Sequence, residues 1–264
     1  PKPQNPFDIN IILNDPFLYE KLLGLIKECM FRAKDRVKLH VEKKSDGTLV
    51  TQADKDINEL ISTKLKSLFP PIPIISEEGN INEGLFMKDF YWLIDPIDGT
   101  SSYVKGKNSY SINIALIYQG SPILGIIANP PTNTVWYGFR EKALVLKNTK
   151  VSPIKTRTFE KSNCKLIVSN ENDYKTNVFI KNIKVAKTER LSSSLKFCEI
   201  AEGNANLYPR LNSISKWDIA AGDAIVRAAN GIVLNIKGEN FNYRTPTVKT
   251  GEFFVLSTKI IWND

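Results

Sequence analysis

The amino-acid sequence predicts a mixed α+β or α/β fold in which layers of helix and sheet are stacked on one another. Two amphipathic helical segments come first, short segments rich in β-branched and aromatic residues follow, and strand and helix alternate after about residue 152. A helix with one apolar stripe and a sheet with one apolar face are stable only when another element covers them. This order of segments therefore favours stacked layers.

Two helices are expected near the start of the chain. For the first, Asp15 is a candidate N-cap and Pro16 a candidate first helical residue. Its apolar residues recur at helical spacing and share one face: Leu22, Leu23, Ile26, Cys29, Met30 and Ala33. The second covers residues 54–68 and stops before Pro70, whose ring cannot continue a helix. Asp54 is a candidate cap at its start.

Strands are expected in the middle of the chain, where short apolar runs are separated by Gly, Pro and Asn residues typical of turns. These runs cover residues 72–75, 90–94, 111–118, 123–128, 134–139 and 143–146. Their arrangement predicts a largely antiparallel sheet. Pro96 is expected to end the second run, because proline has no amide hydrogen to donate to a sheet.

The last part of the chain has an α/β texture. A strand is expected at residues 166–169, and helices are expected at residues 194–201 and 217–229, each followed by glycine. A chain of 264 residues is large for one domain but short for two. We therefore expect one compact unit with an N-terminal α+β half, residues 1–155, and a C-terminal α/β half, residues 156–264.

Composition excludes several classes of protein. Hydrophobic residues make up 42% of the chain, which is enough for a core, and no run approaches the about 18 apolar residues of a membrane-spanning helix. The first residues lack the layout of a signal peptide, so the sequence predicts a cytoplasmic protein, with peripheral association with the inner membrane left open. The three cysteines are far apart and favour reduced thiols. His40 is the only histidine, which excludes most catalytic sites that pair histidine with serine or cysteine and most zinc sites.

The net charge of +8 suits nucleic acid, an anionic membrane surface or a phosphorylated small substrate, and its sign alone does not choose among them. The densest basic stretch, residues 32–44, is interrupted by Asp35 and Glu42. No RNA-binding signature is visible. A solvated basic face is the simpler interpretation of this stretch.

The strongest local signal is YWLIDPIDGTSSY, in which an apolar strand leads into Asp95 and Asp98 and then into a glycine turn. Two carboxylates at a strand end can face one divalent cation. The amides of Gly99 and Thr100 would then point outward, and a helix that starts at Ser101 would make them an anion site. Metal and phosphate would therefore meet at one place.

Three alternatives compete with this interpretation: an ordinary acidic turn, a calcium loop and the nucleophile strand of a D-x-D-G-T phosphatase. A helix-loop-helix calcium loop needs a ligand two residues on and Glu at its twelfth position, but Ile97 and Gly106 stand there. The D-x-D-G-T pattern has one residue between the aspartates, whereas Pro96 and Ile97 make two, so it stays a runner-up. An acidic turn stays open for this segment alone.

Carboxylates also recur at the ends of other elements. Glu77 and Glu78 follow a short apolar run, Asp54 lies at the head of the second helix, and Asp218 lies in the first turn of the helix at residues 217–229. Each has a structural alternative, as a helix cap, a solvated turn or a partner of the helix dipole. Together they form the set of oxygen ligands that a two-metal site requires.

These motifs resemble those of the inositol monophosphatase superfamily of magnesium-dependent, lithium-sensitive phosphatases. The matching segments are SEE at residues 76–78, WLIDPIDGT at residues 92–100 and WDIAAGDAIVRAANG at residues 217–231. Residues 111–131 and 193–211 are similar to the bacterial, CysQ-type 3′(2′),5′-bisphosphate nucleotidase branch of that superfamily. The resemblance covers about residues 46–231 and implies a layered α-β-α-β-α sandwich.

The resemblance also implies a metal site and catalytic residues. Two or three Mg²⁺ ions would be held by Glu77, Asp95, the backbone carbonyl of Ile97, Asp98 and Asp218. Asp54 and Thr100 match the pair that orients and deprotonates the attacking water, and Glu77 belongs to the same catalytic set. The nucleophile would be water, with no covalent phosphoenzyme.

The resemblance further implies the contacts with substrate. The phosphate and the rest of the substrate would meet Asp98, Gly99, Thr100, Ser193, Lys196, Arg210 and Asp218. Two segments depart from the nucleotidase pattern: Ser101 and Ser102 stand where that branch usually has Lys and Glu, and residues 169–172 read S-N-E-N in place of S-R-S-H. Both departures remove basic groups but leave the metal ligands intact.

The implied reaction is hydrolysis of a phosphate monoester, with adenosine 3′,5′-bisphosphate converted to AMP and phosphate. The alternatives are an inositol-1-monophosphatase or sugar phosphatase of the same superfamily and, outside this class, a non-catalytic nucleic-acid-binding protein. A catalytically inactive interaction protein is disfavoured because all expected metal ligands are present. The expected partner is a small phosphorylated substrate, without nucleic acid or a transmembrane segment, and a homodimer stays open.

Overall fold

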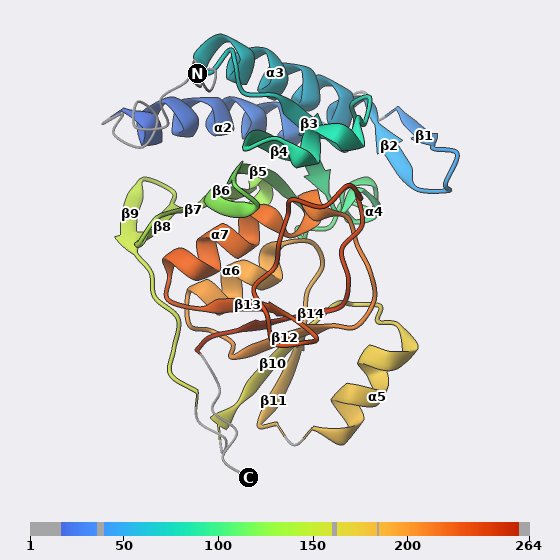
Figure 1. Cartoon of the computed structure of the whole chain (residues 1–264), viewed down its shortest axis with the longest axis vertical. Helices are drawn as coiled ribbons and strands as arrows, with labels where there is room; N and C mark the ends of the chain where they lie inside the picture. The colour runs from blue at the N-terminus through green and yellow to red at the C-terminus, as the bar shows by residue number, and fades with distance from the viewer. Residues whose placement is uncertain (1–16, 36–39, 160–162, 184, 259–264) are drawn as a thin grey trace, which may run out of the picture.

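A pair of helices covers one face of the larger of two main sheets. The computed structural model describes residues 17–35, 40–159, 163–183 and 185–258. In it, helix α2 (Leu18–Lys34) packs beside α3 (Gln52–Leu68), as Figure 1 shows. Apolar residues at three- and four-residue spacing form a stripe on each helix and bury against the sheet in one continuous core.

The larger sheet has seven strands in the order β3-β4-β5-β6-β7-β8-β9. They are β3 (Ile74–Ser76), β4 (Phe90–Asp98), β5 (Ser111–Tyr118), β6 (Ser121–Asn129), β7 (Thr134–Phe139), β8 (Lys142–Lys147) and β9 (Lys150–Pro153). Only the β3–β4 pair is parallel. Side chains alternate along β4, so Trp92 and Ile94 face the helix pair while Tyr91 and Leu93 face the opposite core.

A second pair of helices, α6 (Leu195–Ala201) and α7 (Ala220–Ala228), lies between the large sheet and a smaller one. The smaller sheet has the order β11-β10-β12-β14-β13. Its strands are β10 (Lys165–Val168), β11 (Lys187–Arg190), β12 (Leu207–Arg210), β13 (Ile232–Asn235) and β14 (Phe253–Leu256). Helix α5 (Tyr174–Asn182) packs on its outer face through Phe179 and Ile180. The α-β-α-β-α sandwich is therefore confirmed.

Several short elements lie near the ends of these layers. Strands β1 (Val41–Lys43) and β2 (Leu49–Thr51) form an antiparallel hairpin, and helix α4 (Thr100–Val104) follows β4 (Figure 1). Further short 3₁₀ segments are η1 (Glu83–Met87), η2 (Pro130–Thr132) and η4 (Lys216–Asp218).

The predicted elements of the N-terminal half are present with small shifts. The strands at residues 111–118 and 134–139 have the predicted bounds. The expected roles of Asp15 and Pro16 fall outside the described residues. Asp54 is not the N-cap of α3: that position belongs to Thr51, and Asp54 is the third helical residue in a reciprocal capping box.

Two further sequence-based expectations were wrong, and several elements were not predicted. Pro96 does not end its strand, because β4 continues to Asp98 through an irregular register. The segment at residues 217–229 is not one helix, because η4 ends at Asp218 before α7 begins at Ala220. The last part of the chain also contains helix α5 and four strands, β11 to β14, that the sequence did not reveal. These strands are four residues long, too short for a clear alternation of apolar and polar positions.

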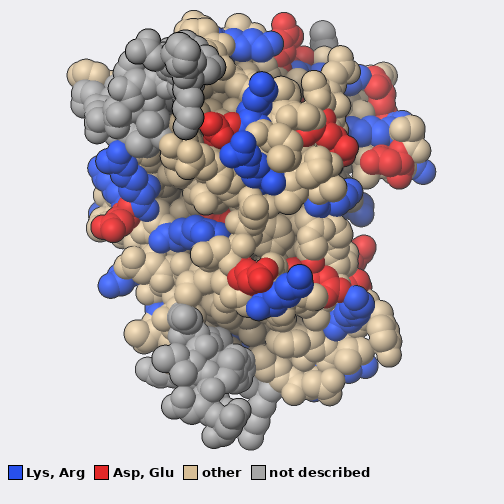
Figure 2. All heavy atoms as spheres, viewed as in Figure 1, with Lys and Arg blue, Asp and Glu red and all other residues tan. Residues whose placement is uncertain are grey.

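The structure bears on three features that were inferred from composition: the cysteines, membrane-spanning helices and the distribution of charge. The three cysteines, Cys29, Cys164 and Cys198, are free and buried. No described helix is long and apolar enough to span a bilayer. On the face shown in Figure 2, Lys and Arg side chains are interspersed with Asp and Glu and form no single patch.

Close contact between helix α7 and the large sheet depends on two glycines. A Cβ atom on Gly125 of β6 would lie 2.2 Å from the carbonyl oxygen of Ala221, and one on Gly138 of β7 would lie 2.5 Å from Cα of Ile225. Both contacts are with the helix backbone, which cannot move aside as a flexible side chain would. The two glycines therefore set the depth at which α7 lies on the sheet.

We expect Gly125→Ala to lower the free energy of unfolding by about 1–3 kcal/mol, because the new methyl group overpacks the helix–sheet contact. Gly24→Ala is the matched control, since a Cβ there meets no heavy atom within 4 Å. Because Gly24 lies in the middle of α2, Gly24→Ala should instead stabilise the protein by roughly 0.5–1 kcal/mol. Thermal unfolding of both variants measures the difference, and equal effects would contradict the close contact.

Candidate active site

The two aspartates of the D-P-I-D-G-T segment share one face of the sheet because β4 is irregular there. Asp95 pairs with Asn113 of β5 and Asp98 pairs with Ser111, so three steps along β4 match two along β5. Side chains two positions apart on a strand point to the same face. The irregular register therefore puts both carboxylates on one side, and Pro96, which has no amide hydrogen, lies within it.

Three carboxylates from distant parts of the chain converge at this strand end. Oxygen atoms of Glu77, Asp95 and Asp218 lie within 4.8 Å of one another. Glu77 follows β3, and its amide donates to the carbonyl of Ile94 at 3.1 Å. Asp218 ends η4, where its carboxylate accepts a hydrogen bond from the Ser215 amide at 2.9 Å. Backbone hydrogen bonds thus hold Glu77 and Asp218 in place.

Burial opposes the ionisation of Asp95, Asp98 and Asp218. Asp95 is 1% exposed, and burial, followed by the charge of Glu77, raises its pKa well above the usual range. Burial also raises the pKa of Asp98 and brings that of Asp218 to about 8. The Oδ1 atom of Asp95 is buried and has no hydrogen-bond partner among the described residues. Clustered carboxylates with an unsatisfied buried oxygen are a suitable environment for a cation.

The donors around this point are all oxygens, which suit a hard cation such as Mg²⁺. They line a cavity of about 450 Å³, here called the acidic cavity. Its lining includes Glu77, Asp95, Ile97, Asp98, Gly99, Thr100 and Asp218, together with Gly47, Thr48 and Leu49 of the β1–β2 hairpin. Every residue predicted to hold metal therefore borders the same cavity.

Asp98 lies beside the three clustered carboxylates and joins two cavities. Its Oδ2 accepts hydrogen bonds from the Ser194 amide and, at 3.4 Å each, from Ser111 Oγ and Asn113 Nδ2. It also borders a second cavity of about 310 Å³, here called the basic cavity after its four cationic side chains, Lys105, Lys107, Lys196 and Arg210. The two cavities share Asp98, Gly99, Ser101 and Asp218 in their linings.

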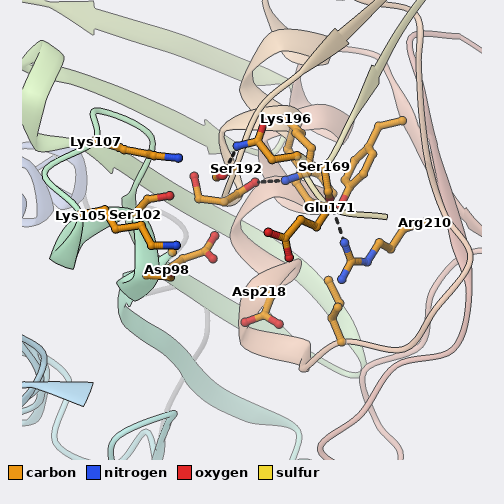
Figure 3. Close-up of a pocket in the computed structure, with 17 residues that line it drawn as sticks. Asp98, Ser102, Lys105, Lys107, Ser169, Glu171, Ser192, Lys196, Arg210 and Asp218 are labelled. Atoms are coloured by element: carbon orange, nitrogen blue, oxygen red, sulfur yellow. Dashed lines mark hydrogen bonds between the residues drawn. The ribbon is translucent and has the colours of Figure 1, made fainter. Parts of the chain in front are cut away.

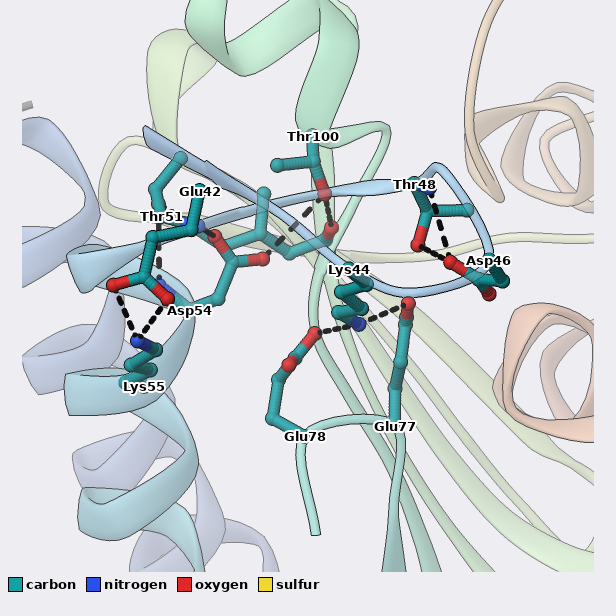
Figure 4. Close-up of polar contacts among 11 residues, drawn as sticks. Glu42, Lys44, Asp46, Thr48, Thr51, Asp54, Lys55, Glu77, Glu78 and Thr100 are labelled. Carbon is teal, nitrogen blue, oxygen red and sulfur yellow. Dashed lines mark hydrogen bonds and ion pairs between the residues drawn. The ribbon is translucent and has the colours of Figure 1, made fainter. Parts of the chain in front are cut away.

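Lys44 of the β1–β2 hairpin reaches the carboxylates that follow β3. Its Nζ lies 3.0 Å from Oε1 of Glu77 and 2.5 Å from Oε1 of Glu78 (Figure 4). The sequence did not identify this contact, since Lys44 belongs to a basic stretch that resembles a solvated face. The ion pairs show that the site accommodates positive charge next to a predicted metal ligand.

Asp54 and Thr100, predicted to act as a pair, lie together. Thr100 Oγ1 is 3.5 Å from Asp54 Oδ1 and 3.0 Å from the Ile97 carbonyl oxygen, so its hydrogen can be directed to either (Figure 4). Asp54 Oδ2 accepts hydrogen bonds from the amide of Thr51 at 2.8 Å and from its hydroxyl at 2.5 Å. Burial outweighs these hydrogen bonds and raises the pKa of Asp54 to about 6.

The three residues predicted to meet the rest of the substrate, Ser193, Lys196 and Arg210, border the basic cavity (Figure 3). Lys196 is 4% exposed, and its ammonium donates to the backbone carbonyls of Leu191 and Ser193 at 3.2 and 2.5 Å. Burial lowers its pKa to about 8. Arg210 donates through Nη1 to Ser169 Oγ at 2.8 Å, while its Nε is buried and has no hydrogen-bond partner in the described part of the chain.

Other residues of the basic cavity were not predicted as site residues. Lys105 and Lys107, just after helix α4, and Glu171, after β10, contribute charged side chains to its lining. No motif marks them in the sequence. The segments that depart from the nucleotidase pattern also border this cavity, through Ser101, Ser102, Ser169, Asn170 and Glu171. The sole histidine, His40, is exposed and pairs with Glu42 at 3.6 Å.

Comparisons with known proteins agree with this geometry. The model of the inositol monophosphatase family matches residues 18–262. The chain is 39% identical over 209 residues to the 3′(2′),5′-bisphosphate nucleotidase CysQ of Buchnera aphidicola, with 78% of each chain covered. It is 35% identical over 202 residues to the enzyme of the same name from Salmonella typhimurium, covering 76% of this chain and 82% of that one.

The fold is likewise similar to solved structures. The crystal structure of CysQ from Bacteroides thetaiotaomicron, described as a bacterial member of that family, superposes with a TM-score of 0.79 at 23% identity. The match covers 96% of this chain and 100% of the other. At this level of identity, the comparison supports the fold alone.

In the presence of a chelator, we expect the protein to lose stability as the pH rises from about 5 to about 8. The pKa values of Asp95, Asp98 and Asp218 are raised by folding, so in this window the folded state binds more protons than the unfolded state. Asp95→Asn removes one of these buried charges and should raise the melting temperature at pH about 8, by roughly 2–4 °C for each kcal/mol recovered.

The matched control is Asp56→Asn, because Asp56 is exposed on α3. It should leave the melting temperature almost unchanged in chelator. Adding Mg²⁺ should stabilise the wild type more than Asp95→Asn, since a ligand of the folded state raises its stability. Destabilisation of the metal-free protein by Asp95→Asn would contradict this account of the cluster.

Proposed function

Because the chain belongs to the inositol monophosphatase family, a family of phosphatases, we propose that it is a Mg²⁺-dependent 3′(2′),5′-bisphosphate nucleotidase. It would hydrolyse adenosine 3′,5′-bisphosphate to AMP and phosphate. The main supporting observation is the cluster of Glu77, Asp95 and Asp218, with a buried oxygen that lacks a partner, next to a cavity lined by cations. The names of the relatives support the choice of substrate.

Two or three Mg²⁺ ions would be held by Glu77, Asp95, the Ile97 carbonyl, Asp98 and Asp218. Bound Mg²⁺ would act as a Lewis acid on the phosphate and make a water molecule more acidic. The hydrogen bonds to Asp98 from Ser194, Ser111 and Asn113 orient its carboxylate before any ligand arrives. Lys44 must release Glu77 for this residue to bind metal, and Glu78 remains available as its partner.

Asp54 and Thr100 would orient and deprotonate the attacking water. The Thr100 hydroxyl can accept a hydrogen bond from water while it donates to Asp54 Oδ1, 3.5 Å away. With a pKa of about 6, Asp54 is mostly ionised at neutral pH and can receive the proton. Its two hydrogen bonds from Thr51 keep the carboxylate directed at Thr100.

The chain offers two groups of substrate contacts on either side of Asp98. The amides of Gly99 and Thr100 would donate to the phosphate that is cleaved. Ser193, Lys196 and Arg210 would contact the rest of the substrate in the basic cavity. Lys196 suits this role because, among the described residues, its buried ammonium donates hydrogen bonds only to backbone carbonyls, although the charge of Asp98 also acts on it. We further propose that the enzyme acts in the cytoplasm, with a homodimer as one assembly to test.

An inositol or sugar phosphatase of the same family is the second candidate. The observation that favours it is the lining of the basic cavity, where Ser101, Ser102 and Asn170 are uncharged and Glu171 is anionic. A non-catalytic nucleic-acid-binding role has only the net charge of +8 in its favour. This role predicts that the protein binds to a polynucleotide column and that the binding weakens steeply as the salt concentration rises.

We expect phosphate release from adenosine 3′,5′-bisphosphate that requires Mg²⁺ and stops in EDTA. Asp95→Asn and Asp98→Asn should each lower kcat by about 10²–10³-fold or more, because each removes an oxygen charge that positions the reacting centre. Asp56→Asn is the control for a lost aspartate charge on the surface. Inositol 1-phosphate is assayed in parallel. Full activity in EDTA, or in both site variants, would exclude the proposal.

We expect kcat/KM to rise with pH through about 6 and then level off, because Asp54 must be ionised to accept a proton. Thr51→Val should move this rise to higher pH, since the Thr51 hydroxyl donates to the ionised carboxylate and lowers its pKa. Thr51→Ser keeps a hydroxyl and should leave the profile in place. A profile that is the same in all three proteins would rule out Asp54 as the base.

A further inference from the structure

Two lysines that no motif identifies form one wall of the basic cavity. Helix α4 ends at Val104, and the next residues, Lys105 and Lys107, flank Gly106, whose φ of 71° turns the chain. Both lysine side chains line the cavity next to Asp98 and Ser102 (Figure 3). Among the described residues, neither forms an ion pair within 4.0 Å.

The charges around the cavity favour an anion once the acidic cavity holds metal. The basic cavity is lined by four cations and three carboxylates, which are Asp98, Glu171 and Asp218. Asp98 and Asp218 also border the acidic cavity, so bound cations would neutralise them. The lining of the basic cavity would then carry four positive side chains and one uncompensated negative side chain, Glu171. Such an imbalance inside a concave site attracts a negatively charged group.

Buried donors in the same cavity also lack a strong acceptor. Within the described ranges, Arg210 Nε is buried without a hydrogen-bond partner. In the same ranges, the Lys196 ammonium, 4% exposed, donates only to neutral carbonyl oxygens. A buried donor without an acceptor is costly, so an anionic ligand that accepts a hydrogen bond from Arg210 Nε would stabilise this arrangement. Arg210 and Lys196 therefore add to the positive charge of the cavity lining, beside the exposed lysines.

The cations differ in how much freedom they have to meet that anion. In the view of Figure 3, Arg210 lies at the opposite end of the cavity from Lys105 and Lys107, and Glu171 lies between them, above Asp218. Arg210 is held by Ser169, and Lys196 is held by two carbonyls. Lys105 and Lys107 are exposed, and their side chains have no hydrogen-bond or ion-pair partner among the described residues. They can therefore close on a ligand with little competing interaction.

We propose that Lys105 and Lys107 bind the second phosphate of a substrate whose first phosphate occupies the metal site. The two lysines would then determine the preference for a nucleoside bisphosphate over a monophosphate. This inference rests on the proposed phosphatase function, because it assigns the cleaved phosphate to the acidic cavity. Asp98, which borders both cavities, marks the boundary between the two phosphate positions.

The test compares adenosine 3′,5′-bisphosphate with adenosine 3′-monophosphate, which lacks only the 5′-phosphate. Lys105→Gln/Lys107→Gln should raise KM for the bisphosphate by about 10–100-fold, the loss expected for charge-assisted hydrogen bonds, with kcat changed by less than about threefold. For the monophosphate, kcat/KM should stay within about threefold of the wild type. Inhibition by the product AMP should weaken by a similar factor, whereas inhibition by adenosine should not.

The control is Lys64→Gln/Lys66→Gln, which removes two exposed lysines at the same spacing on α3, away from both cavities. It should leave both substrates unaffected and so separates local contacts from net charge. If the lysine variant is unchanged, or slows both substrates equally, the inference is wrong while the proposed function stands. If the wild type hydrolyses neither substrate, the proposed function itself fails.

Discussion

The mutual repulsion of buried carboxylates is the constraint on which the rest of this structure depends. Glu77, Asp95 and Asp218 bring oxygen atoms within 4.8 Å of one another, in surroundings that favour the neutral forms of Asp95 and Asp218. Such an arrangement persists only where the backbone imposes it. The parallel β3–β4 pair holds Glu77, the irregular register of β4 holds Asp95, and the capping box of η4 holds Asp218.

The middle helical layer allows the two parts of the chain to share this site. Asp218 lies just before α7, and α7 packs against β6 and β7 at the depth that Gly125 and Gly138 allow. A looser contact would move Asp218 away from the carboxylates of the large sheet. The same placement puts the acidic and basic cavities side by side, with Asp98 in the lining of both. Packing between layers therefore organises the charges of the site.

Local sequence patterns were good predictors where one element buries one face. Helix α3 and strands β5 and β7 follow directly from apolar spacing and from turn residues. They were poor predictors in the smaller sheet, where strands are short and are defined by neighbours far along the chain, as in the pairing of β12 with β14. The sequence also did not predict that β4 continues through Pro96. A proline normally ends a strand, but it is tolerated where the register is irregular.

The sequence alone determined which chemistry is available: carboxylate oxygens at the ends of several elements, the Asp54 and Thr100 pair, and almost no histidine. Tertiary structure alone decided which groups meet. It brought Lys44 to Glu77 and Glu78 and placed Lys105 and Lys107 in the wall of the basic cavity. An exposed lysine has no local pattern that distinguishes a binding role from solvation, because its partner is set by the packing of segments distant in the chain.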